Sequence, residues 1–351
     1  MKKLLLVFAI TSVNNGYAEP TNEEAQNQWM FSSKVRLDFR NRTEFQPKSL
    51  SSSAWELQFL NLSIKKQVKP QTSFHAALKG ESTKFSNNTP QQDQSLDFRK
   101  LFLKHKIGDS SQISFGKIKV QRGGFSANEP KIETVRFDNI IPQLPKKFQT
   151  GLHLSTNVNG WKLSGQSFNG KGSETTKEQK NHELGHQFSL NKSFGSLSLL
   201  ASYGRSAQFF QKTSEAEVTE LQRHNAAGGV KWGNKRSFLS LDYVIVRTSS
   251  YQLFTAEGAS HIQGFTSRSF ILNSRYSLSS VLLGAKLAYS PEFSQANTSY
   301  KRRMATAFVG KVASPLLEYR LSAAYAEDGF DQDVAIKSTS DIIISFIGRF
   351  H

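Results

Sequence analysis

Apolar and polar residues alternate along almost the whole chain, and this pattern constrains the fold more than any other feature of the sequence. In residues 31–40 the side chains of Val35, Leu37 and Phe39 share one face of an extended chain. The opposite face carries Lys34, Arg36, Asp38 and Arg40. A period of two residues with one apolar and one polar face predicts a β-strand.

The alternation recurs with one rhythm from residue 29 to the C-terminus, and no long stretch has the period of an amphipathic helix. The predicted strands are 29–40, 54–65, 71–81, 95–106, 111–121, 148–158, 161–170, 182–193, 195–206, 222–233, 236–248, 264–278, 281–290, 299–312, 315–327 and 340–350. The sequence therefore predicts sixteen strands.

The connections between these segments fall into two classes that alternate strictly. The short ones are 67–70, 107–110, 159–160, 194, 234–235, 279–280 and 313–314, and the long ones are 41–53, 82–94, 122–147, 171–181, 207–221, 249–263, 291–298 and 328–339. Asn159-Gly160 is the clearest short turn, because Asn-Gly is the strongest hairpin signal. Such alternation is typical of an outer-membrane barrel with short periplasmic turns. A soluble exported β-sandwich, the alternative, has no reason to sort its loops in this way.

The two faces of the predicted strands differ as a membrane barrel requires. The apolar face includes Leu241, Leu287, Leu321 and Ile344, and the opposite face Lys286, Ser290, Lys311, Glu318, Arg320, Ser322, Ser345 and Arg349. Aromatic residues near strand ends fit the girdles at the two membrane–water interfaces, although aromatic residues favour strands in any case. We predict an all-β fold, a 16-stranded antiparallel transmembrane β-barrel around a water-filled lumen.

The N-terminus carries the features of an export signal. Lys2 and Lys3 precede an apolar run at 4–10, and a small-residue cleavage site ends at Ala18. The apolar run is shorter than the roughly 20 residues that a membrane-spanning helix needs. The sequence predicts a signal peptide at 1–18, a short leader at 19–28 and a barrel at 29–351, located in the bacterial outer membrane.

The chain is strongly basic, with a formal net charge of +17. Without Lys2 and Lys3 it has 43 basic and 28 acidic residues, a charge of +15. This surplus favours anionic partners: small anions, or outer-membrane lipids and lipopolysaccharide. Nucleic acid is excluded as a partner, because the chain is exported and its basic residues are scattered. The absence of cysteine excludes disulfides and thiolate metal sites.

The connection at 122–147 is unusual for its length, and such loops are mostly functional or disordered. Gly123, Gly124 and three prolines prevent the flanking strands from continuing through it. We expect this third long loop to fold into the mouth of the barrel and narrow its lumen.

Basic residues on this loop and on two strands form a candidate pore constriction, because rings of Arg and Lys select anions. They are Lys34, Arg36, Arg40, Lys117, Lys119, Arg122, Arg136, Lys146 and Lys147. Ile118 is out of phase with Phe115, so a β-bulge at Gly116 is predicted, which would turn Lys117 and Lys119 into the lumen. Each residue taken singly has an alternative role as a solvated rim charge or a lipopolysaccharide contact.

The segment 98–170 carries several soft motifs. It contains Arg99-Lys100, the turn Gly108-Asp109, the sequence ISFGKIK at 113–119 and Phe168-Asn169-Gly170. Together these resemble the phosphate-selective porin O and P family. The resemblance implies a sixteen-stranded, usually trimeric channel that selects anions through basic residues of the lumen and third loop, and it adds Arg99 to the candidate set. Residues 121–124 read QRGG, where the family often has Pro-Phe-Gly, so anion preference carries over better than phosphate specificity.

Residues 182–186 match the H-E-x-x-H pattern of zinc proteases letter for letter. That chemistry needs a helix, which brings both histidines onto one face. Here the motif runs into an alternating strand, where the two histidines would lie about 13 Å apart, at about 3.3 Å per residue. We therefore predict no metal site, no cofactor and no catalytic residues.

We predict a passive outer-membrane porin that prefers anions, with phosphate or related oxyanions as candidate solutes and a homotrimer as the expected assembly. A barrel enzyme acting on lipids is the alternative from another class. The chain has no Gly-x-Ser-x-Gly elbow, but a catalytic triad is defined in space and not by sequence order.

Overall fold

The computed structural model describes residues 29–45, 50–86, 89–121, 123–128, 148–169, 184–208, 211–212, 216–218, 221–234, 236–255, 258–262, 264–295, 298–330 and 337–350. The predicted signal peptide at 1–18 and the leader at 19–28 lie outside these residues. Among the residues described, no helix is long and apolar enough to cross a membrane.

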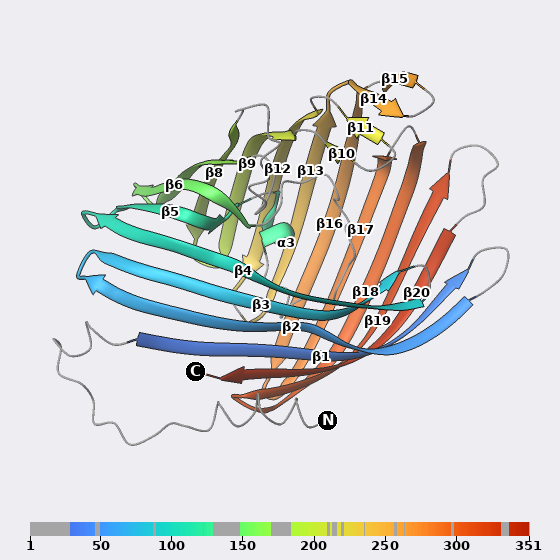
Figure 1. Ribbon diagram of the computed structural model, residues 1–351. Coiled ribbons are helices and arrows are strands. Elements are labelled where there is room, and N and C mark those ends of the chain that lie inside the picture. The colour runs from blue at the N-terminus through green and yellow to red at the C-terminus, as the bar shows by residue number, and fades with distance from the viewer. Residues whose placement is uncertain are drawn as a thin grey trace.

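Sixteen antiparallel strands form one closed barrel, as predicted (Figure 1). The ring closes where the last strand pairs with the first, from Ser33 opposite Phe350 to Phe45 opposite Ser338. The strands are β1 (Trp29–Phe45), β2 (Leu50–Lys69), β3 (Thr72–Ser86), β4 (Thr89–Ile107), β5 (Ser111–Lys119), β6 (Phe148–Val158), β7 (Trp161–Asn169), β8 (Leu184–Phe194), β9 (Leu197–Gln208), β12 (Leu221–Gly233), β13 (Phe238–Thr248), β16 (Phe265–Leu278), β17 (Val281–Gln295), β18 (Thr298–Ser314), β19 (Leu317–Phe330) and β20 (Lys337–Phe350).

Several strands extend further than the alternation predicts. β3 and β4 pair out to Ser86 and Thr89, and β17 and β18 pair out to Gln295 and Thr298. β1 and β2 likewise pair out to residues 44 and 50. Most residues of the predicted long connections 41–53, 82–94 and 291–298 are therefore in strands, where the loop prediction is wrong, and residues 46–49, 87–88 and 296–297 lie outside the described residues. Backbone hydrogen bonds hold a ladder together even where both faces are polar and the sequence shows no apolar period.

Two other long connections contain a small sheet that the sequence did not predict. It has four strands in the order β10 (Gln211–Lys212), β11 (Ala216–Val218), β14 (Tyr251–Thr255) and β15 (Gly258–Ile262). β10 and β11 lie in the connection after β9, and β14 and β15 lie in the connection after β13. The pairing of β11 with β14 links the two connections at the end of the barrel opposite the short turns. At the short-turn end, positive φ angles at Asn159 (50°) and Gly160 (76°) confirm the predicted Asn-Gly hairpin.

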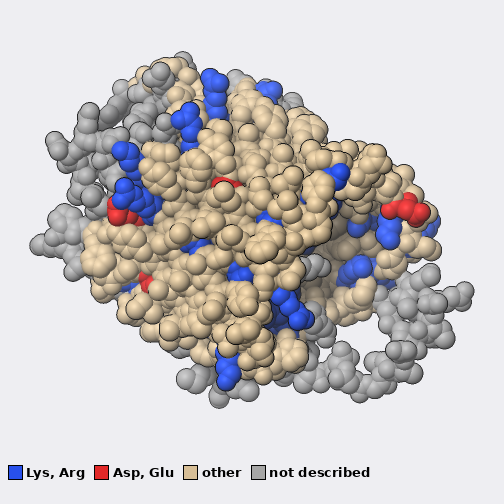
Figure 2. All heavy atoms as spheres, turned by 180° about the vertical axis from the view of Figure 1, so that it is seen from behind, with Lys and Arg blue, Asp and Glu red and all other residues tan. Residues whose placement is uncertain are grey.

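The two faces of the barrel wall separate as expected. Leu287 and Leu321 on the outer face are 50% and 51% exposed, whereas Ser345 on the inner face is 0% exposed. Seen from behind in Figure 2, most of the surface is uncharged, and the basic side chains on it outnumber the acidic ones. The outer wall is thus an apolar band, and most charge in the strands is directed inward.

Lys311 is an exception to the predicted faces. It pairs with Val281 on one side and Tyr319 on the other, so it lies on the outer face. The prediction that Lys311 faces the lumen is therefore wrong. Lys311 lies close to the short turn after Ser314, where a long basic side chain can extend beyond the apolar band.

Candidate functional site

The chain enters the barrel interior directly after β5. Val120 is completely buried, and the backbone N–H of Gln121 donates to Oε1 of Gln166 on β7 (2.8 Å). The Gln166 side chain also donates through Nε2 to the carbonyl of Lys119 (2.9 Å). One buried glutamine therefore holds the chain on both sides of the point where β5 ends.

The segment continues across the interior to the opposite wall. Ser202 on β9 donates to the carbonyl of Gly123 (2.9 Å), and the short helix α3 (Phe125–Asn128) follows. The backbone N–H groups of Phe125 and Ser126 donate to the two carboxylate oxygens of Asp242 on β13, at 2.9 and 2.7 Å. In Figure 1, α3 lies within the ring of strands.

These contacts define an inward-folded segment at 120–128, which confirms that the third loop turns into the lumen. Residues 129–147, which carry the predicted Arg136, Lys146 and Lys147, lie outside the described residues, as does Arg122.

Two glycines allow the inward-folded segment to approach Asp242. A Cβ at Gly124 would meet the Asp242 side chain, and a Cβ at Gly229 on β12 would meet both that carboxylate and the ring of Phe125. Asp242 itself is 0% exposed. Sequence reasoning missed Asp242, although an isolated acid in the apolar strand 238–248 was a usable signal.

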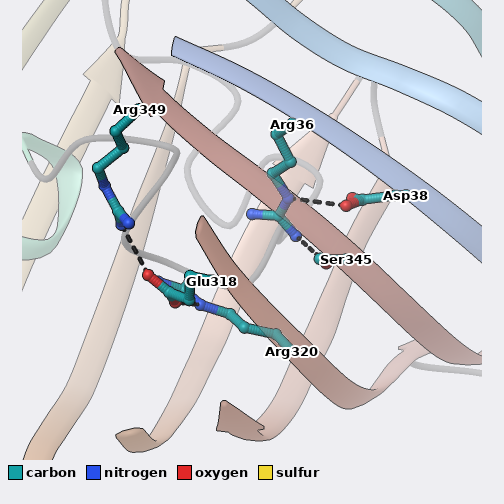
Figure 3. A network of polar contacts seen from close by, with 6 residues as sticks. All are labelled: Arg36, Asp38, Glu318, Arg320, Ser345 and Arg349. Carbon is teal, nitrogen blue, oxygen red and sulfur yellow. Dashed lines mark hydrogen bonds and ion pairs between the residues drawn. The ribbon is translucent and has the colours of Figure 1, made fainter. Parts of the chain in front are cut away.

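A second cluster lines the inner wall where the barrel closes (Figure 3). Arg36 on β1 donates to Asp38 (2.8 Å) and to Ser345 on β20 (3.1 Å). Glu318 on β19 accepts from Arg320 and, at 2.7 Å, from Arg349. All of these side chains except Arg349 are almost fully buried.

The same wall carries another ion pair further along the strands. Arg42 binds Asp341 in a bidentate arrangement, at 2.9 and 3.2 Å, and Arg40 lies 3.8 Å from the same carboxylate. We call the set Arg36, Asp38, Arg40, Arg42, Glu318, Arg320, Asp341 and Arg349 the paired arginine wall. It joins five arginines to three acids, so most of its positive charge is neutralised within the protein.

The remaining predicted residues have different locations. Lys34 pairs with Arg349 on the inner face of β1. Arg99 occupies a bulge of β4, because Ala77 pairs with Lys100 and Leu78 with Phe98. Lys119 ends β5 and borders an inner cavity, where its backbone carbonyl meets Gln166. It has the register of Lys117 on the outer face, however, so its predicted place in the lumen is wrong.

The predicted β-bulge at Gly116 is wrong. Both ladders of β5 pass Gly116 in register, although its φ of 124° is unusual. Lys117 pairs with Leu101, whose side chain is exposed on the outer wall, so Lys117 lies on the outer face. Ile118 lies on the inner face and is 2% exposed. The apolar side chains at 118 and 120 face the interior because they are covered there, not because the strand changes phase.

Strand register identifies many further basic residues on the inner face that the candidate set lacked. Among the described side chains, the inner-face cations are Lys34, Arg36, Arg40, Arg42, Lys65, Lys79, Lys100, Lys104, Lys106, Lys162, Arg223, Lys231, Arg275, Lys286, Arg302, Arg320 and Arg349, against Asp38, Asp242, Glu318 and Asp341. The interior wall is thus strongly cationic.

The zinc-protease pattern lies partly on β8, where Leu184, Gly185 and His186 are extended. This confirms the strand interpretation for those three residues. In the part of the chain with described coordinates, no group of three or more His, Asp or Glu side chains is placed to hold a metal ion.

Comparison with known proteins gives likeness of fold only. No family model and no curated protein matches the sequence. The outer-membrane channel DcaP of Acinetobacter baumannii superposes with a TM-score of 0.66, at 11% identity, over 93% of this chain and 98% of that one. The anion-selective porin of Comamonas acidovorans gives 0.63, at 10% identity, over 92% and 100%. The trimer form of OmpT, an outer-membrane protein of Vibrio cholerae, gives 0.59, at 9% identity, over 92% and 99%.

Proposed function

We propose that the protein is a porin of the bacterial outer membrane, a passive diffusion channel that prefers anions. The observation that carries this proposal is the surplus of cations on the inner face of a closed barrel, combined with a segment that folds across the interior. A narrow cationic passage raises the local concentration of anions and excludes cations.

Several features support the membrane location and the assembly. Many large apolar side chains, among them Phe188, Leu241 and Leu321, are exposed on the outer face, which lipid favours and water does not. The similar structures include an outer-membrane channel, an anion-selective porin and the trimer form of an outer-membrane protein. We extend the proposal to phosphate or related oxyanions as solutes, to outer-membrane lipids and lipopolysaccharide as surroundings, and to a homotrimer.

The test is conductance of the purified protein in a planar lipid bilayer with a salt gradient. The proposal expects open-channel currents whose reversal potential has the sign of a channel more permeable to anions than to cations. It also expects the mobility of the protein in gels to change on heating, as it does for other barrels. Absence of conductance, or a cation-side reversal potential, contradicts it. Phospholipid hydrolysis by the same preparation would favour the lipid enzyme instead.

A further inference from the structure

A cavity of about 320 Å³ lies between the inner wall of β4–β7 and the start of the inward-folded segment. It is lined by Lys100, Phe102, Ser114, Ile118, Lys119, Gln121, His153 and Gln166. We propose that this cavity is a binding subsite for a small organic carboxylate with an apolar body, an inference that rests on the proposed anion channel.

The charged groups of this cavity favour an anion. No acid lines it, and of its two lysines Lys100 lies on the inner face, whereas Lys119 has the register of Lys117 on the outer face. The charged groups that act most strongly on Lys100 are Arg99 and Lys34, which are both cations. An ammonium group that lies among other cations, as Lys100 does among the described side chains, gains from a bound anion, because the anion supplies counter-charge.

Polar groups converge on the same space. Ser114 pairs with His153, and His153 pairs with Gln166, so their side chains form one row across β5, β6 and β7. Nε2 of His153 is buried and has no hydrogen-bond partner among the described residues. Buried polar atoms of this kind are normally satisfied by water or a ligand. A carboxylate can accept hydrogen bonds from the Lys100 ammonium group and the Ser114 hydroxyl. It can also accept one from Nε2–H of His153, in the neutral tautomer that carries its proton there.

The apolar part of the lining distinguishes an organic anion from a bare inorganic one. Phe102 and Ile118 contribute hydrocarbon surface, and Phe102 is held in place by stacking on His75, with ring centroids 4.7 Å apart. A phosphate ion would leave this surface wet, whereas an apolar body would cover it. The volume lies at the lower end of the range for small-molecule sites, about 300–1,000 Å³.

A second cavity continues along the same wall toward the short-turn end. It measures about 400 Å³ and is lined by three lysines, Lys104, Lys106 and Lys162, and by one acid, Asp109, in the turn at Gly108–Ser110. The two cavities give an anion successive lysines on its way through the barrel.

The experiment measures block of chloride current through the full-length channel in a planar bilayer, with benzoate, acetate and inorganic phosphate as probes. The inference expects benzoate to block at a concentration at least about tenfold below that of acetate and of phosphate. Lys100→Gln should weaken the benzoate block about tenfold, because it removes a charge-assisted hydrogen bond. Lys162→Gln makes the same charge change in the second cavity and should alter the block less than about twofold.

The outcomes separate this inference from the proposed function. Equal block by benzoate and acetate overturns the apolar body, and tighter block by phosphate assigns the site to inorganic oxyanions. An anion-selective channel that benzoate does not block overturns the carboxylate subsite and leaves the proposed anion channel standing. A wild-type channel without anion selectivity overturns both proposals. The wild-type comparison decides the matter even where Lys100→Gln does not fold, and gel mobility reports folding of each variant.

Discussion

Two basic regions of the barrel's inner surface differ in how their charge is compensated. On the paired arginine wall, the acids Asp38, Glu318 and Asp341 lie within ion-pair distance of the arginines. On the wall formed by β4–β7, which carries Lys100 and Lys104, the strongest charged influences on both lysines come from other cations.

This difference separates charge that stabilises the fold from charge that is available to a solute. A buried arginine that is paired with a carboxylate adds little net charge to the electric field in the lumen. Removing the carboxylate destabilises the fold, because it leaves the arginine charge buried and uncompensated. A lysine among lysines raises the local potential and attracts counter-ions. Counting basic residues on the lumen would treat the two walls alike, although only the second is expected to set the sign of the current.

The largest expected effect comes from breaking the compensation on the paired arginine wall. Glu318→Gln leaves Arg320 and Arg349 without their carboxylate, and loss of one partner of a buried pair costs about 3–5 kcal/mol. The free energy of unfolding, measured by urea titration in lipid vesicles, should fall by that amount. Glu327→Gln is the control, because its partner Arg303 is 64% exposed and the pair is worth below about 1 kcal/mol. Equal losses in both variants would contradict a buried, compensated wall.

The next effect concerns the inward-folded segment. Asp242→Asn removes the charge that binds two backbone N–H groups, and hydrogen bonds to charged groups are worth about 1.5–3 kcal/mol each. We expect a higher and noisier single-channel conductance because the segment leaves the lumen more often. Ser202→Ala, which removes one neutral hydrogen bond worth about 0.5–1.5 kcal/mol, should have a smaller effect in the same direction. An unchanged conductance in Asp242→Asn would mean that the segment does not limit the current.

Charge reversal on the two faces of the barrel wall gives a subtler difference. Lys104→Glu on the inner face should lower the anion-to-cation permeability ratio, because it acts inside the passage. Lys311→Glu makes the same change on the outer face and should leave the ratio within error, since exposed charges are screened beyond about 8 Å at physiological salt. A similar shift in both variants would contradict the assignment of the inner face.

The smallest expected effect is the change of the anion-to-cation permeability ratio with salt concentration. The Debye length shrinks from about 30 Å at 0.01 M to about 3 Å at 1 M, so the field of the uncompensated lysines reaches less of the passage. We expect the permeability ratio of the wild type to decline gradually over this range. A ratio independent of salt would point to selection by shape.

The alternation of side chains was sufficient to predict the closed sixteen-stranded barrel, since each strand has one apolar face. It also placed Lys34, Arg36 and Arg40 on the inner face, because phase alone decides that. The carboxylate that lies beside Arg40 could not be predicted, since Asp341 on β20 meets β1 only where the barrel closes. The error at Gly116 came from assuming that apolar residues face lipid, whereas Ile118 and Val120 are covered from within.

The central claim is that the lysines of the β4–β7 wall set the preference for anions. The most direct test is the reversal potential in a tenfold potassium chloride gradient, for the wild type and for the double variant Lys100→Glu, Lys104→Glu. We predict an anion-side reversal potential for the wild type that moves to zero or to the cation side in the double variant. An anion-side potential of the same size in the double variant would contradict the claim.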